Sequence, residues 1–154
     1  MDTLTHKDTL TADSLYEVDF YQWALRNADL LRQGRLTEID IENVAEELEG
    51  MARSDKRELT NRLAVLIMHL LKWQYQPKRR SRSWRETINN QRKDIELLIE
   101  DSPSLKNNIE TAISKGFILA KRTFEDETGI SAEELPETCL YTFDQLMDYG
   151  FRPE

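Results

Sequence analysis

Cysteine and histidine are nearly missing from this 154-residue chain, which has one cysteine, Cys139, and two histidines. A lone cysteine forms no disulfide within the chain, and one cysteine with two histidines falls short of the sets that hold structural zinc. Glycine and proline number only 5 and 4, too few turn formers for a fold of many strands. Because hydrophobic residues still make up 39% of the chain, the composition predicts a helical globule rather than a disordered protein.

Long hydrophobic runs are absent as well. The longest, residues 63–71, is too short to span a bilayer, and residues 1–12 lack the apolar stretch of a signal peptide. We therefore expect a soluble, cytoplasmic protein with no membrane partner. Residues 1–12 show no periodicity, so we expect a flexible segment there, followed by a single domain over residues 13–154.

Charge of both signs is present but unevenly distributed. The net charge is −8, and residues 125–154 account for it with nine acidic residues and one arginine. Residues 38–49 hold six acidic residues and no basic one, whereas residues 78–93 hold seven basic residues and one acidic one. A basic patch attracts phosphate, nucleic acid or an acidic protein surface, and here it can also pair with the acidic tail of its own chain or of a second copy.

Apolar residues recur at helical spacing in the first half of the chain. The first helix is expected to begin with Asp13 or Ser14 as its cap and to end at Gly34. The second is expected over residues 38–74, with Thr37 as its cap and one weak point around Ser54. At ~1.5 Å per residue, this helix would be roughly 54 Å long.

The second half of the chain predicts two more helices and a tail. The third helix is expected from Ser83, as its cap, to Asp101, and the fourth over residues 102–128, where Gly116 would allow a close helix crossing. Short helical turns are expected after Ser131 and Thr142. The prediction is an all-α, antiparallel bundle of four main helices with a long second helix and a short helical C-terminal tail packed on it or on another subunit.

Several separated blocks carry a family resemblance. They are Ala45-Glu46-Glu47-Leu48-Glu49, His69-Leu70-Leu71-Lys72-Trp73-Gln74, Ser83-Trp84 and Ser102-Pro103-Ser104-Leu105. In this order they resemble the bacterial family catalogued as domain of unknown function 29, over nearly the whole chain. The resemblance implies an all-α helical bundle and transfers no activity or catalytic residue.

Three carboxylates are candidates for a buried polar site. Asp19 has Leu15, Tyr16 and Trp23 at helical contact spacing, so it is expected to face the core, where an unpaired carboxylate is costly. Antiparallel pairing of the first two helices would bring Asp19 near Glu46 and Glu47, and three carboxylates could hold Mg²⁺ or Mn²⁺. We favour structural hydrogen bonding with exposed charge and assign no metal.

His69 and Lys72 are the second pair of buried polar candidates, within the apolar segment 63–71. The favoured interpretation is a neutral histidine bonded to a hydroxyl or carbonyl such as that of Thr87; the alternative is a general acid or base beside Lys72. In a continuous helix, Glu47 and His69 would lie roughly 33 Å apart, too far to share one site.

The basic corner between the second and third helices is the candidate site for an anion or a partner. Its residues are Lys78, Arg79, Arg80, Arg82 and Arg85. Trp73, Tyr75 and Trp84 flank it; single-stranded nucleic acid could stack on them, but aromatic residues at such a corner more often seal a core. Cys139 is expected to be a core or interface residue rather than a nucleophile.

We favour a non-catalytic binding or interaction module that works through the basic corner 78–85 and the acidic tail 125–154. Its partners would be proteins, including a second copy of the chain. Nucleic-acid association and a metal-assisted hydrolase using Asp19, Glu46 and Glu47 are the alternatives. The residues leave open whether the chain is an enzyme, and they indicate no cofactor.

Overall fold

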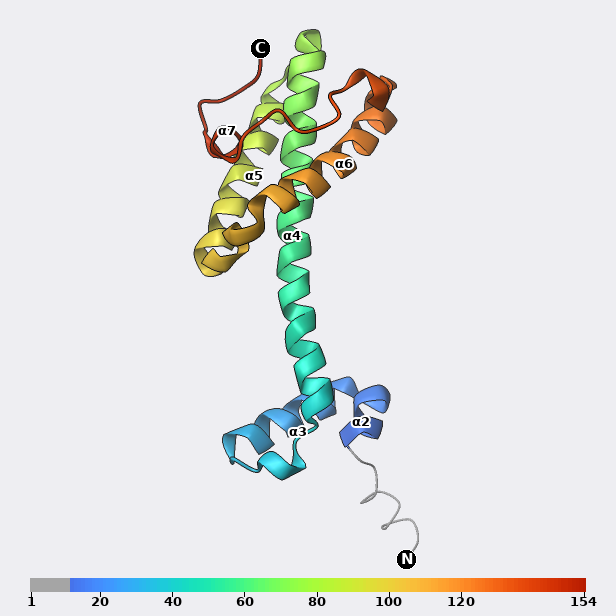
Figure 1. The fold of residues 1–154 in the computed structure, drawn as a ribbon, viewed down its shortest axis with the longest axis vertical. Coiled ribbons are helices and arrows are strands. Elements are labelled where there is room, and N and C mark those ends of the chain that lie inside the picture. Colours follow the sequence, from blue (N-terminus) through green and yellow to red (C-terminus); the bar gives the residue numbers. More distant parts are fainter. Residues whose placement is uncertain (1–11) are drawn as a thin grey trace, which may run out of the picture. The chain divides into compact units, whose positions relative to one another are not determined.

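The computed structural model describes residues 12–154, with side chains from Leu15 onward. The flexible segment predicted for residues 1–12 therefore falls almost entirely outside the described residues. Over the described part, the chain is all-α and has no strand, which confirms the predicted fold class (Figure 1). The backbone divides into two compact units, the first ending at Arg53 and the second beginning at Ser54; the single domain over 13–154 stays a prediction.

The first unit contains α2 (Ala12–Val18), α3 (Phe20–Arg32) and the beginning of α4 (Ile41–Tyr75). The single first helix that we predicted is wrong, because the chain breaks at Asp19. The Asp19 side chain accepts a hydrogen bond from the Gln22 backbone N–H at 3.1 Å and so caps the new helix α3. Asp13 and Ser14 lie inside α2 rather than at its cap, whereas Gly34 follows α3 with a φ of 69°, as a helix stop requires.

The helix α4 begins at Ile41 instead of residue 38, because Leu36–Glu38 forms a separate 3-10 turn. Asp40, not Thr37, caps it: an Asp40 carboxylate oxygen accepts the backbone N–H of Asn43 at 3.4 Å. From there α4 continues without a break through Ser54 to Tyr75, over 35 residues. The long second helix is confirmed.

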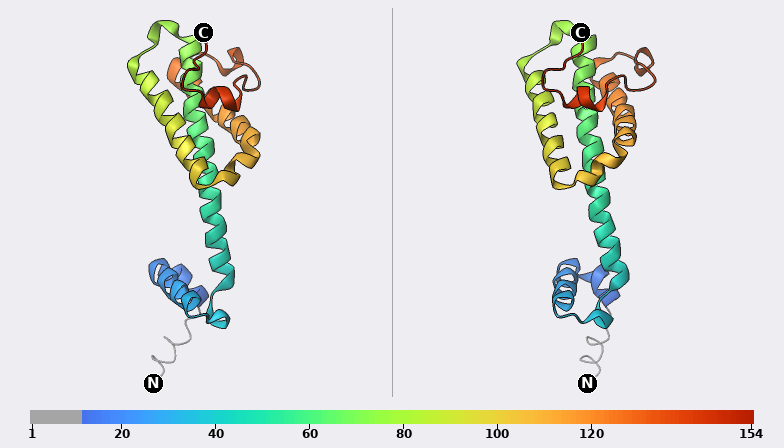
Figure 2. Two further views of the ribbon diagram at one scale, coloured as in Figure 1. Left: turned by 90° about the vertical axis from the view of Figure 1, so that its left-hand side faces the viewer. Right: turned by 60° about the vertical axis from the view of Figure 1, so that its left-hand side comes forward.

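The second unit is built on the C-terminal part of α4, with α5 (Arg82–Asp101), α6 (Ile109–Thr128) and the short α7 (Phe143–Met147). In Figures 1 and 2, α5 and α6 lie beside this part of α4, and the C-terminal segment that carries α7 runs across them. Three 3-10 turns complete the unit: Pro77–Arg79, Pro103–Asn108 and Ala132–Glu134. The predicted fourth helix is thus a 3-10 turn followed by α6.

Side-chain hydrogen bonds set the ends of these elements. Ser81 caps α5 by accepting the Trp84 N–H at 3.2 Å, so the cap predicted at Ser83 is wrong by two residues. Ser131 and Thr142 cap their short elements as predicted, and Thr142 forms a capping box with Gln145.

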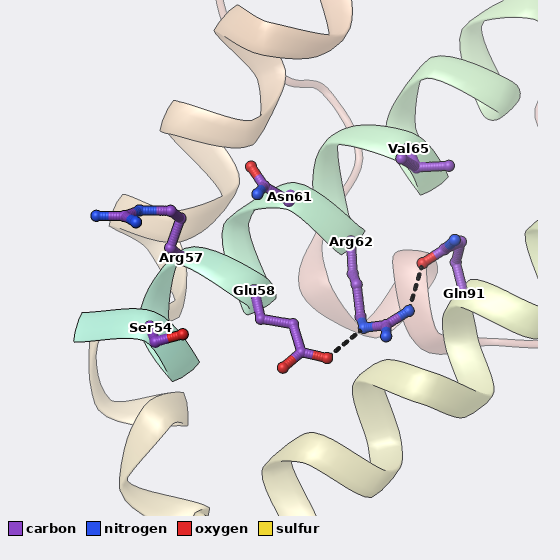
Figure 3. A pocket seen from close by; sticks show the side chains of 7 residues that line it. All are labelled: Ser54, Arg57, Glu58, Asn61, Arg62, Val65 and Gln91. Atoms are coloured by element: carbon purple, nitrogen blue, oxygen red, sulfur yellow. Dashed lines mark hydrogen bonds and ion pairs between the residues drawn. The ribbon is translucent and has the colours of Figure 1, made fainter. Parts of the chain in front are cut away.

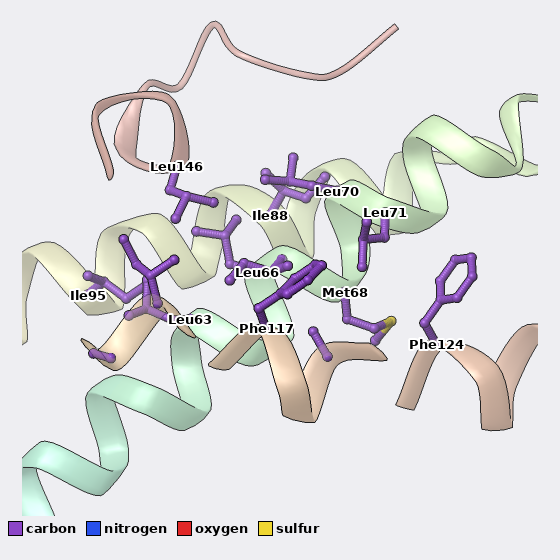
Figure 4. Packing of buried hydrophobic residues seen from close by; sticks show 14 of the residues in the cluster. Leu63, Leu66, Met68, Leu70, Leu71, Ile88, Ile95, Phe117, Phe124 and Leu146 are labelled. Carbon is purple, nitrogen blue, oxygen red and sulfur yellow. The ribbon is translucent and has the colours of Figure 1, made fainter. Parts of the chain in front are cut away.

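The core of the second unit joins α4, α5, α6 and the C-terminal segment (Figure 4). Its central side chains are Leu63, Leu66, Leu70, Ile88, Ile95, Phe117, Phe124 and Leu146, and each is buried. Burial stabilises the fold by roughly 1.5–3 kcal/mol for each large side chain. Gly116 allows the close crossing predicted for it, since a Cβ there would lie 3.2 Å from both the Ala64 nitrogen and the Thr60 oxygen of α4.

Candidate functional site

The basic corner is organised around the ring of Trp73, at the C-terminal end of α4. The guanidinium carbons of Arg80, Arg85 and Arg152 lie 5.0, 6.0 and 5.2 Å from the ring centroid. Arg80 also donates from Nε to the Trp73 carbonyl oxygen at 2.8 Å. A cation over an indole ring is attracted by its quadrupole, so Trp73 holds three positive charges together.

All three arginine side chains are exposed, and none of their guanidinium groups forms an ion pair with an acidic residue of the described chain. Arg82 differs, because its Nε forms an exposed ion pair with Glu86 at 3.0 Å. Lys78 and Arg79 are exposed as well and also form no ion pair with the described residues. The corner therefore presents a local excess of positive charge on an acidic protein.

Trp73 and Trp84 are both half-buried, and Trp73 packs against the core of the second unit. The ammonium of Lys72 lies 5.6 Å from the Trp84 ring centroid. Trp73 thus contacts both the core and cations of its own chain, which supports the interpretation that this ring seals the core.

Arg152 reaches the corner because the tail is anchored by Arg92, a fully buried side chain of α5. Arg92 donates from Nε to the Leu146 carbonyl oxygen at 2.6 Å and from Nη2 to that of Phe151 at 2.7 Å. A charged side chain is ordinarily exposed, so composition alone does not indicate this burial. The missed signal is its spacing, since Ile88, Arg92 and Ile95 fall on one helix face.

His69 and Lys72 are both partly buried, but the structure gives them separate partners. The His69 ring nitrogen Nδ1 lies 2.9 Å from the Val65 carbonyl oxygen, so Nδ1 carries the proton. Thr87 is not its partner. Burial lowers the pKa of His69; the Val65 hydrogen bond opposes this shift, and the charge of Lys72 adds to it. Lys72 itself forms an ion pair with Glu127.

The carboxylates Asp19, Glu46 and Glu47 do not form a common site. Asp19 is exposed because it caps α3, which corrects its predicted burial, and Glu46 is exposed and paired with Arg53 at 3.0 Å. Glu47 is partly buried and accepts a hydrogen bond from the Tyr16 hydroxyl. Nowhere in the described part of the chain do three His, Cys, Asp or Glu side chains gather to hold a metal ion.

Among the described residues of the first unit, the buried carboxylate is instead Asp40. Its Oδ2 accepts a hydrogen bond from the Trp23 indole N–H at 2.9 Å, and its backbone N–H donates to the Asn27 side chain at 2.9 Å. Asn27 is itself buried and donates to the Trp23 carbonyl oxygen. With Thr37 as the predicted cap, Asp40 falls in the first turn of the helix; as the actual cap, its carboxylate accepts a hydrogen bond from the backbone N–H of Asn43.

Cys139 is half-buried beside the C-terminal segment, and its thiol donates a weak hydrogen bond to the Tyr141 carbonyl at 3.6 Å. Burial raises the pKa of this thiol, with the Tyr141 hydrogen bond opposing the shift, so the unreactive protonated form is favoured. Next to it, Tyr141 donates from its hydroxyl to Gln74 at 2.6 Å and lines a pocket of about 240 Å³ with Leu71, Phe117, Pro136 and Phe151.

A second, open pocket of about 380 Å³ lies along α4 and α5 (Figure 3). Arg62 extends across it and bonds to Glu58 at 2.9 Å and Asp94 at 3.0 Å, which neutralises its charge within the chain. Arg57, the other basic residue that lines the pocket, is exposed and forms no ion pair with the described residues, so the pocket has one unmatched positive charge where the basic corner has several.

Fold and site together define an all-helical protein with a cationic corner and without a recognisable catalytic cluster among its described residues. No described helix combines the length and apolar character that crossing a bilayer requires. The chain belongs to the family described as domain of unknown function DUF29, whose sequence model matches residues 15–152. Neither the curated proteins nor the solved structures contain a match to this chain.

Proposed function

We propose that this protein is a non-catalytic binding module whose basic corner, residues 78–85 together with Arg152, binds an acidic segment of another protein. The observation that carries this proposal is the gathering of the Arg80, Arg85 and Arg152 guanidinium groups on the Trp73 ring without an acidic partner in the described chain.

Like charges that share one ring repel each other, and this repulsion offsets part of the cation–π attraction. An incoming carboxylate would relieve the repulsion and form charge-assisted hydrogen bonds with the guanidinium groups, which match carboxylate geometry. Arg80 is already oriented by its bond to the Trp73 carbonyl, so part of the entropic cost of ordering the site is met before binding.

Two observations favour a protein partner over nucleic acid. The Trp73 ring already carries three guanidinium groups, so a base would have to displace them in order to stack. In addition, the net charge of −8 weakens the long-range attraction of a polyanion as densely charged as DNA or RNA.

The acidic tail of the protein contains a segment that can serve as a test ligand for the basic corner. Residues 125–137 contain six acidic residues and no basic one. Among the tail acids, Glu127 pairs with Lys72, while Glu133, Glu134 and Glu137 are exposed. A second copy of the chain could therefore present the same kind of segment to the corner.

Titration calorimetry with a synthetic peptide of residues 125–137 tests the proposal. We expect binding at low salt that weakens as salt is raised, and a loss of at least tenfold in affinity in the double variant Arg80→Glu, Arg85→Glu. The matched control is Lys115→Glu with Arg122→Glu, two exposed bases of α6, which should leave the affinity within twofold.

An oligothymidylate of equal charge serves as the competitor. If it binds more tightly than the peptide and depends on Arg80 and Arg85, the corner is a nucleic-acid site and the protein proposal fails. Equal binding by the corner variant and the α6 control would mean that the corner is not the site.

A further inference from the structure

The pocket of about 240 Å³ beside Tyr141 lies within the second unit, where α4, α6 and the C-terminal segment meet. Two of its lining side chains, Leu71 and Phe117, are buried and belong to the core (Figure 4). Two others are exposed: Leu140, with 70% of its surface accessible, and Gln145. The pocket therefore extends from the core to the solvent, and a ligand can enter it.

The lining of this pocket is mostly apolar and aromatic, as is typical of small-molecule sites. Its apolar and aromatic members are Leu71, Tyr75, Phe117, Pro136, Leu140, Tyr141, Phe151 and Pro153. A cavity of roughly 150 Å³ holds one benzene molecule. A volume of about 240 Å³ thus accommodates a six-membered ring with a short side chain.

Two side-chain amides supply the pocket with hydrogen-bond donors. The side-chain oxygen of Gln74 accepts from the Tyr141 hydroxyl at 2.6 Å, and that of Gln145 accepts from the Thr142 backbone N–H at 3.0 Å. Burial raises the pKa of Tyr141, so its hydroxyl stays protonated and remains the donor to Gln74. Neither amide nitrogen has a partner among the residues that the structure describes, and both can donate to a ligand.

Lys121 of α6 places a cation beside the pocket. Its ammonium lies 3.4 Å from the Pro136 carbonyl oxygen and 5.1 Å from the ring centroid of Phe117, and both residues line the pocket. Lys121 is partly buried and forms no ion pair within the described chain. Because solvent screens such a charge less than a fully exposed one, it attracts an anion more strongly.

The buried guanidinium of Arg92 adjoins the same pocket from α5. It donates to the carbonyl oxygens of Gln145 at 3.3 Å and Phe151 at 2.7 Å, two further residues of the lining. Its Nη1 atom is buried without a hydrogen-bond partner, and no acidic residue in the described part of the protein forms an ion pair with it. The pocket is therefore flanked by two unmatched positive charges, and no acidic residue lines it.

We infer that this pocket binds a small carboxylate whose apolar part is one ring or a short branched chain. The apolar part packs against Leu71 and Phe117, and its burial supplies most of the affinity. The carboxylate accepts hydrogen bonds from Lys121 and from the Gln145 amide. The unmatched positive charge selects an anion over a neutral molecule of the same shape.

Phenylacetate is the probe, because it joins a single ring to a single carboxylate. In proton–nitrogen correlation NMR spectra, its titration should shift the amide signals of residues 71–75 and 140–145 until they saturate. We expect a dissociation constant on the order of 1 mM or below. Acetate, which lacks the ring, should bind at least about tenfold more weakly. An absence of saturable shifts up to about 20 mM phenylacetate would refute the inference.

Phenylacetamide, a neutral molecule of nearly the same shape, tests the selection by charge. Lys121→Met keeps an apolar side chain of similar length, so it should weaken phenylacetate at least about fivefold and leave phenylacetamide within about twofold. The matched control is Lys115→Met, an exposed lysine of the same helix, which should change neither affinity. An equal loss for both ligands in Lys121→Met, or equal affinities of the unmodified protein for them, would overturn the assignment of a carboxylate.

The basic corner also attracts anions, so the location of the ligand needs its own test. Arg80→Glu with Arg85→Glu should leave the phenylacetate affinity within about twofold, because neither residue lines the pocket. Signal changes confined to residues 78–85, or a loss of binding in this variant, would place phenylacetate on the corner and refute the pocket. The two sites are independent, so a corner that binds no acidic peptide would leave the phenylacetate result unchanged.

Discussion

The guanidinium of Arg92 on α5 donates a 2.6 Å hydrogen bond to the carbonyl of Leu146, a residue 54 positions further along the chain. A second nitrogen of the same group reaches the carbonyl of Phe151. The fully buried guanidinium of Arg92 therefore holds the segment from Leu146 to Phe151 in place. Because Arg152 follows this segment directly, Arg92 also positions Arg152 at the basic corner.

Replacing Arg92 should release this tail. We expect Arg92→Leu to lower the free energy of unfolding by about 2–4 kcal/mol, because it leaves buried carbonyl groups without donors. Urea denaturation measures the loss, and limited proteolysis should show faster cleavage after residue 140. Lys93→Leu, on the exposed side of the same helix, is the control and should change stability by less than about 0.5 kcal/mol.

The two helical glycines should respond to substitution with opposite sign. Gly116→Val is expected to cost about 2–3 kcal/mol, because even a Cβ at this position lies 3.2 Å from α4 backbone atoms. Gly50→Ala should instead stabilise the protein by about 0.5–1 kcal/mol, since its nearest neighbour is the flexible end of Arg53 at 3.7 Å. Thermal unfolding of the two variants measures both effects, and a Gly116→Val protein as stable as the unmodified one would contradict the close crossing.

His69 should make stability depend on pH in a defined direction. Its pKa in the folded protein is lowered by burial, so below an unfolded-state pKa near ~6.5 the unfolded chain binds more protons than the folded one. Stability should therefore fall as the pH drops below this value and be fully present above it. His69→Asn, which can still donate to Val65, should remove this component while leaving the pH dependence from the carboxylates.

Urea unfolding of both proteins between pH 5 and pH 8 provides the measurement. The difference in free energy of unfolding between the unmodified protein and His69→Asn should change only on the acidic side of this range. A difference that is independent of pH would mean that His69 keeps its ordinary pKa in the folded state.

Among the described carboxylates of the first unit, Asp40 should be the most sensitive to substitution. Asp40→Ala removes the acceptor of the Trp23 indole and the cap of α4, and we expect a loss of about 2–4 kcal/mol. Amide hydrogen exchange should then accelerate over α3 and the first turns of α4. Exposed Glu42 provides the control Glu42→Ala, and equal exchange in the two variants would show that the network adds no stability.

Local sequence was sufficient for the helical class, the unbroken helix α4, the stop at Gly34 and the end of α6 at Thr128. It failed where two local patterns competed. At Asp19, helical spacing of apolar residues favoured one long helix, but the carboxylate capped a new helix instead. The same competition between Ser81 and Ser83 moved the start of α5.

The sequence by itself determined which segments are helical and where charge accumulates, since both depend on neighbouring residues and on composition. Tertiary structure alone decided which charged side chains have partners within the chain. It buried Arg92 among carbonyl groups and joined Lys72 to Glu127, but collected Arg80, Arg85 and Arg152 on one ring. Such pairings join residues far apart in the chain, and the packing of helices sets them rather than any local pattern.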